Sequence, residues 1–506
     1  MQKHKALISV YDKNDIELIA ACLMNHNIEL LATGGSLKYL QEKNIPVTDV
    51  ADYTLFPEML NGRVKTLHPK LFGGILFKRN DQIHNTTIDN NNIIAIDFVI
   101  VNLYPFVKKQ QENLTHDELI EFIDIGGPSL LRAAAKNYYD VTVITDIKDY
   151  AGVIQEMNEQ EQTTIETRKK LAAKVFNITS AYDASVANFL NEEIFPQYYN
   201  NTYELKEILR YGENPHQQAA IYADLTQLNN VNQWNQLQGK ELSYNNYRDI
   251  QAAINIVKEF NEPVCCAVKH NTPCGVAIGK DALDAYQKAY LADPVSIFGG
   301  IIAFNVILNE ATATLLNDTF LEVIIAPDFT KASLEILAKK KNVRVLKISM
   351  HPIENKQIVS INGGLLVQTS DPVVDYEINV VTKKKPSEYQ INQLVFAQKI
   401  VKHCTSNAIV LCKDYVTVGI GSGQTNRIRS AEQAILQAKE KKVELSECVM
   451  SSDAFFPFND IVKLCATNQI SAIIQPGGSI KDQDSIDSCN EHGIAMLFTG
   501  VRHFKH

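Results

Sequence analysis

Hydrophobic and polar positions change period repeatedly along the first 50 residues. An apolar run at 6–11 (ALISVY) leads into DIELIAACL, whose apolar residues recur at helical spacing. A second apolar run follows at 28–33 (IELLAT), then the helical pattern SLKYLQEK and the short run IPVTDV. Alternation of this kind predicts an α/β fold in which parallel strands are joined by crossover helices.

A second set of elements completes this pattern before residue 150. It comprises a strand at 98–104 (FVIVNLY), the helix HDELIEFI, a Gly-Gly-Pro break, the helix SLLRAAAKN and a strand at 141–145 (VTVIT). Residues 150–195 have a helical, polar-faced pattern, whereas the stretch 196–203 (PQYYNNTY) has no periodicity. We therefore expect a first domain at residues 1–200.

The second half, residues 201–506, resumes the apolar runs. Strands are predicted in PVCCAVKHNTPCG, FGGIIAFN, LEVIIAP and VRVLKI, and after a polar stretch at 383–387 a hairpin is predicted from SNAIVLC and YVTVGIG. A long helix from Gln424 and short strands near Ile473 and Met496 follow. Two α/β subdomains, divided near 375–390, fit this order.

Composition narrows the class of protein. A length of 506 residues suits two to four domains, and 45% hydrophobic with 21% charged residues is an ordinary globular composition. The net charge of −9 argues against a nucleic-acid partner. The apolar run near the N-terminus is too short for a signal peptide, and no apolar stretch approaches a membrane span. We expect a cytoplasmic chain that has no membrane partner, with nine unpaired cysteines and no paired metal-ligand spacing.

A candidate anion site follows the strand IELLAT. Gly34 and Gly35 come directly after it, and Ser36 is placed as the N-cap of the next helix, whose free N–H groups would face an anion. A plain strand-to-helix turn would look the same. The basic loop 61–70 (NGRVKTLHPK), with Arg63 and Lys65, favours a phosphate in this domain.

Spacing alone does not assign chemistry to two further candidates. For Lys136, at the end of the helix after Asp124, the helix dipole is the favoured explanation. Lys269 and His270 follow the apolar strand VCCAV, a favoured ligand position in open α/β sheets, and could form an acid–base pair, but Lys-His dipeptides are common.

Other motifs exclude some activities or suggest a ligand. GVAIGKD at 275–281 departs from a P-loop, GIGSGQ at 419–424 departs from a dinucleotide fingerprint, and the zinc-protease and nucleophile-elbow motifs do not occur. Arg427 and Arg429 stand in the first turn of a helix, where an anionic ligand would compensate them. The aromatic segment SSDAFFPFND is either a hydrophobic corner or a surface that stacks on a flat ring.

Taken in order, the motifs resemble one family along essentially the whole chain. They are SVYDK, TGGS, GRVKTLHP, NLYPF, DIGG and LRAAAKN in the first half, and LRYGENPHQ, KHNTPCG, IFGG, IIAP, GSGQTNRI, SSDAFFPF and RHF in the second. The chain resembles the bifunctional purine biosynthesis enzymes, in which phosphoribosylaminoimidazolecarboxamide (AICAR) formyltransferase is joined to inosine monophosphate (IMP) cyclohydrolase.

The resemblance implies a fold, two reactions and partners. The N-terminal domain would be methylglyoxal-synthase-like and would perform cyclisation, and the C-terminal half would contain two cytidine-deaminase-like subdomains that perform formyl transfer. The co-substrate would be 10-formyltetrahydrofolate, and AICAR, its formylated product FAICAR and IMP would be the small-molecule substrates and products. These are the last two steps of IMP synthesis. Homodimers with transferase sites at the interface are implied, and no catalytic metal is.

For formyl transfer, the resemblance implies His270 as the base and Lys269 as its partner that stabilises charge. The residues it implies around the nucleotide are Arg210, Tyr211, Asn246, Gly299, Glu322, Asn407, Arg427, Phe455 and Arg502. Asp460, Ser479 and Ile480 would lie on the folate side. Glu322 departs from the family, which has an aspartate there.

For cyclisation, the resemblance implies Lys136 as proton donor and acceptor, with Lys65, Tyr104 and Asp124 in the same site. The nucleotide-binding residues it implies are Tyr11, Asp12, Lys13, Thr33, Gly34, Gly35, Ser36, Arg63, Val64, Thr66, Asn102 and Ile125. Two alternatives remain: an enzyme that has lost one activity, for which no missing residue is found, and a regulatory nucleotide-binding module, which would need the phosphate loop but neither Asp124 nor Lys136.

Overall fold

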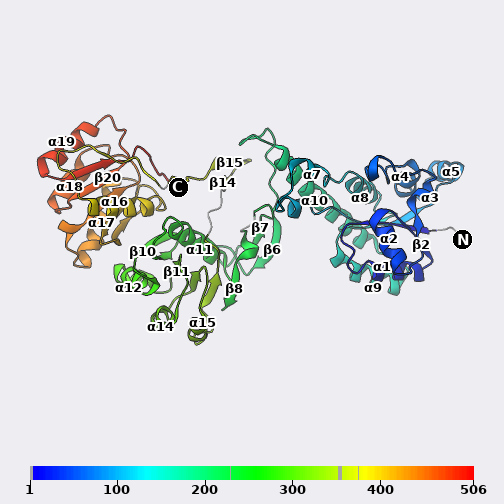
Figure 1. The fold of residues 1–506 in the computed structure, drawn as a ribbon, viewed down its shortest axis with the longest axis horizontal. Helices are drawn as coiled ribbons and strands as arrows, with labels where there is room; N and C mark the ends of the chain where they lie inside the picture. The colour runs from blue at the N-terminus through cyan, green and yellow to red at the C-terminus, as the bar shows by residue number, and fades with distance from the viewer. Residues whose placement is uncertain (1–3, 228–229, 351–355, 374) are drawn as a thin grey trace. The chain divides into compact units, whose positions relative to one another are not determined.

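The chain divides between Tyr203 and Glu204 into two units, Met1–Tyr203 and Glu204–His506, each with its own core (Figure 1). The structure, a computed structural model, describes residues 4–227, 230–350, 356–373 and 375–506. The division falls at the end of the aperiodic stretch 196–203.

A five-stranded parallel sheet forms the centre of the first unit, in the order β3-β2-β1-β4-β5. Its strands are β1 (His4–Val10), β2 (Ile28–Ala32), β3 (Thr48–Asp49), β4 (Ile96–Asn102) and β5 (Thr142–Ile144). Leu7 pairs with Leu31 on one side and with Val99 on the other, and all three are fully buried. The predicted parallel sheet is confirmed.

Helices lie between these strands and after the last of them, and several contact the sheet. They are α1 (Ile16–Asn25), α2 (Gly34–Glu42), α3 (Val50–Thr54), α4 (Pro69–Leu76), α5 (Gln82–Asn90), α6 (Phe106–Gln110), α7 (His116–Ile120), α8 (Gly126–Lys136), α9 (Tyr150–Gln160) and α10 (Ile165–Leu190), with short 3-10 turns at Leu60–Gly62 and Ile147–Asp149. α8 includes the Gly-Gly-Pro segment, because a proline in the first turn has no N–H that the helix needs.

The predicted role of Ser36 as an N-cap is wrong. α2 begins at Gly34, and Thr33 is its N-cap residue without a side-chain hydrogen bond. Ser36 lies inside the helix, where its hydroxyl donates to the carbonyl of Val10 and accepts from the N–H of Val10. Its side chain therefore ties α2 to the end of β1 and leaves the N–H groups at the start of α2 uncapped.

A mixed sheet of twelve strands runs through the second unit, in the order β16-β21-β20-β19-β17-β18-β10-β9-β11-β12-β13-β8. These strands are β8 (Asn235–Gln238), β9 (Val264–Lys269), β10 (Thr272–Ile278), β11 (Ile301–Phe304), β12 (Val323–Ala326), β13 (Arg344–Lys347), β16 (Asn379–Val380), β17 (Ile409–Lys413), β18 (Val416–Gly421), β19 (Val449–Ser452), β20 (Ala472–Gln475) and β21 (Ala495–Phe498). Strands β8–β13 form what we term lobe A and strands β16–β21 form lobe B. The lobes join where Ala277 of β10 pairs with Val416 of β18.

Two separate hairpins complete the strands of this unit, β6 (Glu204–Leu209) with β7 (Ala219–Ala223), and β14 (Lys356–Ile361) with β15 (Gly364–Thr369). Its helices are α11 (Tyr244–Val257), α12 (Ala282–Ala292), α13 (Pro294–Ile297), α14 (Glu310–Asp318), α15 (Lys331–Leu337), α16 (Glu388–Val401), α17 (Arg427–Glu440), α18 (Asp460–Thr467) and α19 (Asp482–His492), with 3-10 turns at Val231–Gln233 and Leu445–Glu447.

The predicted hairpin of β17 and β18 is confirmed, but two other expectations need correction. α17 begins at Arg427 rather than Gln424, because the side chain of Asn426 caps it by accepting the N–H of Ile428. β9 is antiparallel to both of its neighbours, so His270 lies in a hairpin turn rather than at the end of a parallel strand.

The nine cysteines are all free, eight of them buried and Cys274 half-buried. Within the described part of the chain, none of the helices combines the length and the apolar character that a membrane span requires. The same residues contain no group of His, Cys, Asp and Glu side chains arranged to hold a metal ion.

Candidate functional site

A pocket of about 750 Å³ opens at the carboxyl ends of β1 and β4 in the first unit. Five segments line it: residues 9–13, the start of α2, the loop 58–66, the end of β4 with Tyr104, and the loop 120–127. The predicted residues that line it are Tyr11, Lys13, Thr33, Gly34, Gly35, Ser36, Arg63, Lys65, Thr66, Asn102, Tyr104, Asp124 and Ile125. Asp12 and Val64 are sequence neighbours of lining residues.

Two lysines converge on the start of α2. A Cβ atom added to Gly34 would lie 3.3 Å from Nζ of Lys65, and one added to Gly35 would lie 3.5 Å from Nζ of Lys13. The helix N-terminus carries partial positive charge and free N–H groups, and the two ammonium groups add to that field. This corner of the pocket is suited to a phosphate.

Asn102, the last residue of β4, organises the neighbouring loop. Its Oδ1 accepts hydrogen bonds from the N–H groups of Tyr11 (2.6 Å) and Asp12 (3.0 Å), and its Nδ2 donates to the carbonyl of Asp12 (2.8 Å). Because Lys13 also donates to the carbonyl of Tyr11, at 3.0 Å, the loop and its lysine are positioned together.

Asp124 and Tyr104 supply proton-carrying groups to the other side of the pocket. Burial raises the pKa of Asp124, although its hydrogen bond from the N–H of Gly127 and the charge of Lys65 oppose the shift. The pKa of Tyr104 is also raised, first by burial and then by the charge of Asp124. A Cβ atom at Gly127 would lie 2.4 Å from Oδ2 of Asp124, so only glycine permits this close approach.

Arg63 is held by a residue that the sequence did not single out. Its guanidinium forms an ion pair with Glu121, which raises the pKa of Arg63 and lowers that of Glu121. Both side chains are more than half exposed and both residues line the pocket. Such a pair is weak and can exchange partners, so an anionic ligand could compete for Arg63.

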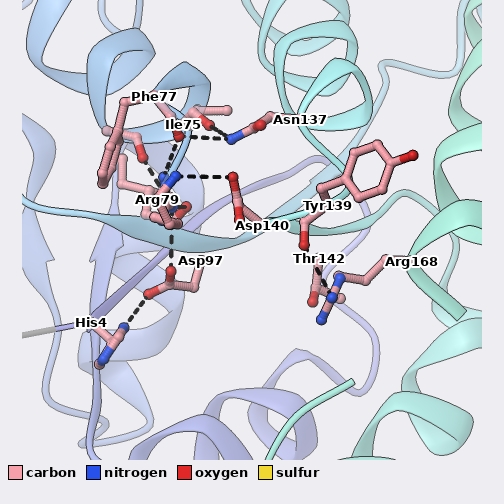
Figure 2. Close-up of polar contacts among 12 residues, drawn as sticks. His4, Ile75, Phe77, Arg79, Asp97, Asn137, Tyr139, Asp140, Thr142 and Arg168 are labelled. Atoms are coloured by element: carbon pink, nitrogen blue, oxygen red, sulfur yellow. Dashed lines mark hydrogen bonds and ion pairs between the residues drawn. The ribbon is translucent and has the colours of Figure 1, made fainter. Parts of the chain in front are cut away.

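Lys136 is not among the described residues that line this pocket. It is the last residue of α8, whose first residues line the pocket, about 15 Å away along the helix axis at ~1.5 Å per residue. The next residue, Asn137, donates to the carbonyls of Ile75 and Phe77 (Figure 2). The structure thus does not bring Lys136 to Lys65 and Asp124.

Figure 2 also indicates at which edge of the sheet the C-terminal end of α8 lies. Arg79, just after Phe77, donates to the carbonyl of Ile96 (3.0 Å) and to the carboxylate of Asp97 (3.2 Å) at the beginning of β4, and Asp97 pairs with His4 at the beginning of β1. The pocket lies at the opposite ends of these two strands. A proton-transfer role for Lys136 stays a prediction of the resemblance.

In lobe A of the second unit, Lys269 and His270 lie where β9 turns into β10. Nζ of Lys269 donates to the carbonyl of Phe298 at 3.0 Å, which brings Lys269 next to Gly299. Gly299 has a φ angle of 73°, a conformation that glycine adopts readily, and its N–H donates to the carbonyl of Phe320. His270 is exposed.

Arg344 in β13 links the other predicted residues of lobe A, and no sequence motif pointed to it. Asn246 donates to Glu322 at 2.9 Å, and Arg344 lies 3.8 Å from the same carboxylate oxygen. Burial lowers the pKa of Arg344, Glu322 opposes this, and the charge of Arg210 lowers the pKa further. Arg210 lies over the ring of Tyr211. The longer carboxylate of Glu322 thus still accepts a hydrogen bond in this group.

In lobe B, Arg427 is buried and bound by protein groups. It forms an ion pair with the fully buried Asp453 and donates to Ser452 and to Oδ1 of Asn407 (2.7 Å). The anion that compensates Arg427 is therefore Asp453 itself, and this carboxylate is not free to accept from a ligand ring. The guanidinium carbons of Arg427 and Arg502 lie 6.0 and 4.4 Å from the ring centre of Phe504.

The predicted folate-side residues lie on two loops of lobe B. Asp460 begins α18, directly after the segment that carries Phe455 and Phe458, of which Phe458 is more than half exposed. Ser479 and the fully exposed Ile480 precede Lys481, whose ammonium lies 4.7 Å from the ring centre of Phe458. The two loops are thus in contact through Phe458 and Lys481.

Comparison with known proteins places the chain in one family. Residues 134–437 match the AICARFT/IMPCHase bienzyme family and residues 15–129 match the MGS-like domain. A bifunctional purine biosynthesis protein PurH from Fusobacterium nucleatum is 52% identical over all of both chains, and proteins of that name from Clostridium botulinum and Clostridium perfringens are 51% and 50% identical over 99–100% of each chain.

The chain belongs to the AICARFT/IMPCHase bienzyme family. It is a bifunctional enzyme of purine biosynthesis, with AICAR formyltransferase and IMP cyclohydrolase activities. Its fold is α/β, with an MGS-like domain in the first unit. A solved structure titled "Crystal structure of ForH" is 34% identical over 36% of this bienzyme and 95% of that chain, with a TM-score of 0.33.

Proposed function

We propose that the pocket of the first unit is the cyclohydrolase site and that residues 201–506 carry formyl transfer from 10-formyltetrahydrofolate to AICAR. The observation that carries the first assignment is the meeting of Lys13 and Lys65 at the N-terminus of α2, on the same pocket as Asp124 and Tyr104. A nucleotide phosphate in the basic corner would leave its ring beside the carboxyl and phenol groups.

In the cyclisation step, the carboxamide nitrogen of FAICAR attacks its formamide carbon, and water leaves to give IMP. Negative charge develops on the formamide oxygen, and the ammonium of Lys65, whose charge reaches Asp124 as well as the start of α2, would stabilise it, with the phosphate left to Lys13 and the N–H groups of α2. Asp124, whose pKa is raised by burial, and Tyr104 are the groups placed to move the proton between nitrogen and oxygen.

In the transfer step, the amine of AICAR attacks the formyl carbon, and the bond from that carbon to N10 of the folate breaks. The amine is a weak nucleophile because its lone pair is conjugated with the ring, so it needs a base. His270 would accept its proton, and Lys269 would stabilise the developing oxyanion. Arg210, Tyr211, Asn246, Gly299 and Glu322 would hold the nucleotide from lobe A. Asn407, Arg427, Phe455 and Arg502 would do so from lobe B.

Asp460, Ser479 and Ile480 would hold the folate, and no metal ion takes part in either step. Formyl transfer to a weak amine is readily reversible, so cyclisation would draw it forward.

We place the enzyme in the cytoplasm, as a homodimer with transferase sites at the interface. The exposed apolar side chains of Val359, Ile361, Leu365 and Leu366 on the β14–β15 hairpin support self-association, because they would be shielded from water. Sedimentation of the purified protein tests this part.

Separate single mutants test the assignment of two sites. Purified enzyme given AICAR and 10-formyltetrahydrofolate should produce IMP. His270→Ala should abolish formyl transfer and retain cyclisation of added FAICAR, whereas Asp124→Asn should lower cyclisation and retain transfer. Equal loss of both activities in either mutant would contradict two independent sites.

A further inference from the structure

We propose that Asp249 is a positioning residue for formyl transfer: its carboxylate holds the backbone of the turn that presents His270. The inference rests on the proposed role of His270 as the base. Asp249 lies in α11, more than 20 positions before the turn, and no sequence motif connects it with His270.

The turn has an unusual backbone for its sequence. Lys269 and Thr272 are paired in the β9–β10 hairpin, so His270 and Asn271 alone make the connection. Their φ angles are 54° and 61°. Two consecutive positive φ angles are those of a type I′ turn, where Asn-Gly is the favoured sequence because glycine adopts them without steric cost. A histidine followed by asparagine is a less favourable choice.

Asp249 supplies the interaction that offsets this preference. Its Oδ1 accepts the N–H of Asn271 at 2.6 Å, and its Oδ2 accepts the N–H of His270 at 3.3 Å. Both N–H groups point to one carboxylate only when the turn has this conformation. A charged acceptor makes such hydrogen bonds stronger than a neutral one does.

The carboxylate is itself fixed by the packing of α11. The next residue, Ile250, is fully buried, as are Ala253 and Val257 on the same helix, in the core that contains β9. Asp249 therefore cannot move far without moving the helix. Its described hydrogen bonds reach the backbone of the turn and not the imidazole, so it acts on where His270 lies rather than on which ring nitrogen carries the proton.

The consequence for catalysis is geometric. A base must lie within hydrogen-bond reach of the amine that it deprotonates, and a displacement of about 1 Å can cost roughly 100-fold in rate. With Asp249 absent, the turn would populate other conformations, and His270 would be correctly placed for a smaller fraction of the time. Nucleotide binding, which depends on other residues, would change less.

The test uses the full-length enzyme and begins with two substitutions of Asp249. Asp249→Ala should lower the transferase kcat by about 10- to 100-fold, with a KM for AICAR that changes by less than about threefold, because positioning of the base matters most in the transition state. Asp249→Asn, which retains one carbonyl oxygen for the N–H of Asn271, should be intermediate. Cyclisation of FAICAR should be unchanged in both.

A second-site substitution separates positioning from a general structural role. Adding Asn271→Gly to Asp249→Ala should recover most of the lost kcat, since glycine favours the turn without help from the carboxylate. Asp281→Ala is the matched control: Asp281 lies after the other end of β10 and accepts the N–H of Asp284 at 2.9 Å, and its loss should leave formyl transfer intact.

Three results would overturn the proposal: an Asp249→Ala enzyme as active as the parent, a loss that Asn271→Gly does not restore, or a loss that lies in KM alone. His270→Ala is measured alongside. If it retains formyl transfer, the proposed role of His270 fails as well; if it abolishes transfer while Asp249→Ala has no effect, only the positioning role fails.

Discussion

The hydroxyl of Tyr182 in α10 accepts a hydrogen bond from the backbone N–H of Asp124 at 2.7 Å and donates one to the carbonyl of Phe122 at 2.9 Å. A single side chain thus satisfies both groups of the loop that carries Asp124 into the pocket of the first unit. The ring of Tyr182 is held in turn by Phe106. Burial raises the pKa of Tyr182 to about 12, so the hydroxyl keeps its proton and donates at any working pH.

We expect Tyr182→Phe to lower the kcat of cyclisation by about tenfold, because the loss of two hydrogen bonds of ~1 kcal/mol each lets Asp124 move. The KM for FAICAR should change little, and formyl transfer should not change. Steady-state assays of the two separate reactions measure this. Tyr53→Phe is the control, since the Tyr53 hydroxyl also accepts a backbone N–H, that of Ile94, outside the pocket. Equal effects of the two mutations would contradict a specific role.

The periodicity of the sequence predicts the strands and helices of the first unit because each strand is buried and each connecting helix has one apolar face. The same reasoning locates Gly34 and Gly35, since a strand that runs into glycines and a helix is a local signal. Tyr182 is different: it lies 58 residues after Asp124, and a tyrosine in a long helix has the same pattern as a core residue. Contacts of this separation leave no local signal.

In the second unit, the sequence likewise points to some charged residues of interest and not to others. The position of Arg427 at a helix start suggested an anion, and the structure supplies one from Asp453, which comes from another strand end. Arg344 was missed because a single arginine in the run VRVLKI is not distinguishable from an exposed strand residue. The partners of Arg427 and Arg344 can be identified only in the structure, because the sheet brings distant strands together.

Lys65 and Lys136 can be compared directly in the cyclohydrolase reaction. Lys65 lies in the pocket, where its charge acts on Asp124, whereas Lys136 lies at the other end of α8 and is exposed. From this geometry we expect Lys65→Met to lower kcat/KM for FAICAR by roughly 100-fold. Lys136→Met should lower it by no more than about threefold, as for an exposed side chain away from the site.

Kinetics of FAICAR cyclisation with both purified variants decide between these assignments. A larger loss in Lys136→Met than in Lys65→Met would favour the role that the family resemblance implies for Lys136, and would show that this side chain reaches the substrate in an arrangement different from the one described.

Asn102 should act on binding more than on chemistry. Its three hydrogen bonds fix the loop of Tyr11 and Asp12, next to the lysine that faces the start of α2. We expect Asn102→Ala to raise the KM for FAICAR by roughly tenfold, equivalent to about 1.4 kcal/mol. Titration of IMP into the enzyme by calorimetry should detect a similar loss of affinity.

The second unit offers a matched control for Asn102. Asn305 likewise accepts a backbone N–H, that of Val264, and donates to the carbonyls of Phe260 and Glu262. Asn305→Ala removes the same kinds of bond from the other unit and should leave cyclisation unchanged. If both variants lost IMP affinity equally, the loop-positioning role of Asn102 would be wrong.

Glu259 connects the two lobes of the second unit. It follows α11 of lobe A, and its Oε1 lies 3.0 Å from Nζ of Lys402 and 2.7 Å from Nε2 of His403, both just after α16 of lobe B. Burial would raise the pKa of Glu259, but the bonds and charges of His403 and Lys402 outweigh it and hold the pKa below its usual value of 4.5. Burial lowers the pKa of His403, so Lys402 is the charged partner near neutral pH.

This shift makes the stability of the second unit depend on pH in a defined direction. The carboxyl pKa is lower in the folded state, so the unfolded state binds more protons than the folded state as the pH falls. The stability that the charged Glu259 contributes above about pH 4.5 is therefore lost below it. Glu259→Gln should lower the free energy of unfolding at pH 7 by roughly 3 kcal/mol, since it leaves Lys402 buried without its counter-charge. The difference from the parent should narrow as the pH falls through this window.

Urea unfolding between pH 7 and pH 4 measures this difference, followed by the fluorescence of Trp234, the single tryptophan, which stacks on Tyr247 of α11 in the same unit. Glu447→Gln is the control, because Glu447 pairs with Lys413 at the surface and is 62% exposed. Its effect should stay below about 1 kcal/mol, as for other exposed ion pairs. A Glu259→Gln deficit that is as large at pH 4 as at pH 7 would mean that packing, and not the carboxylate charge, joins the lobes.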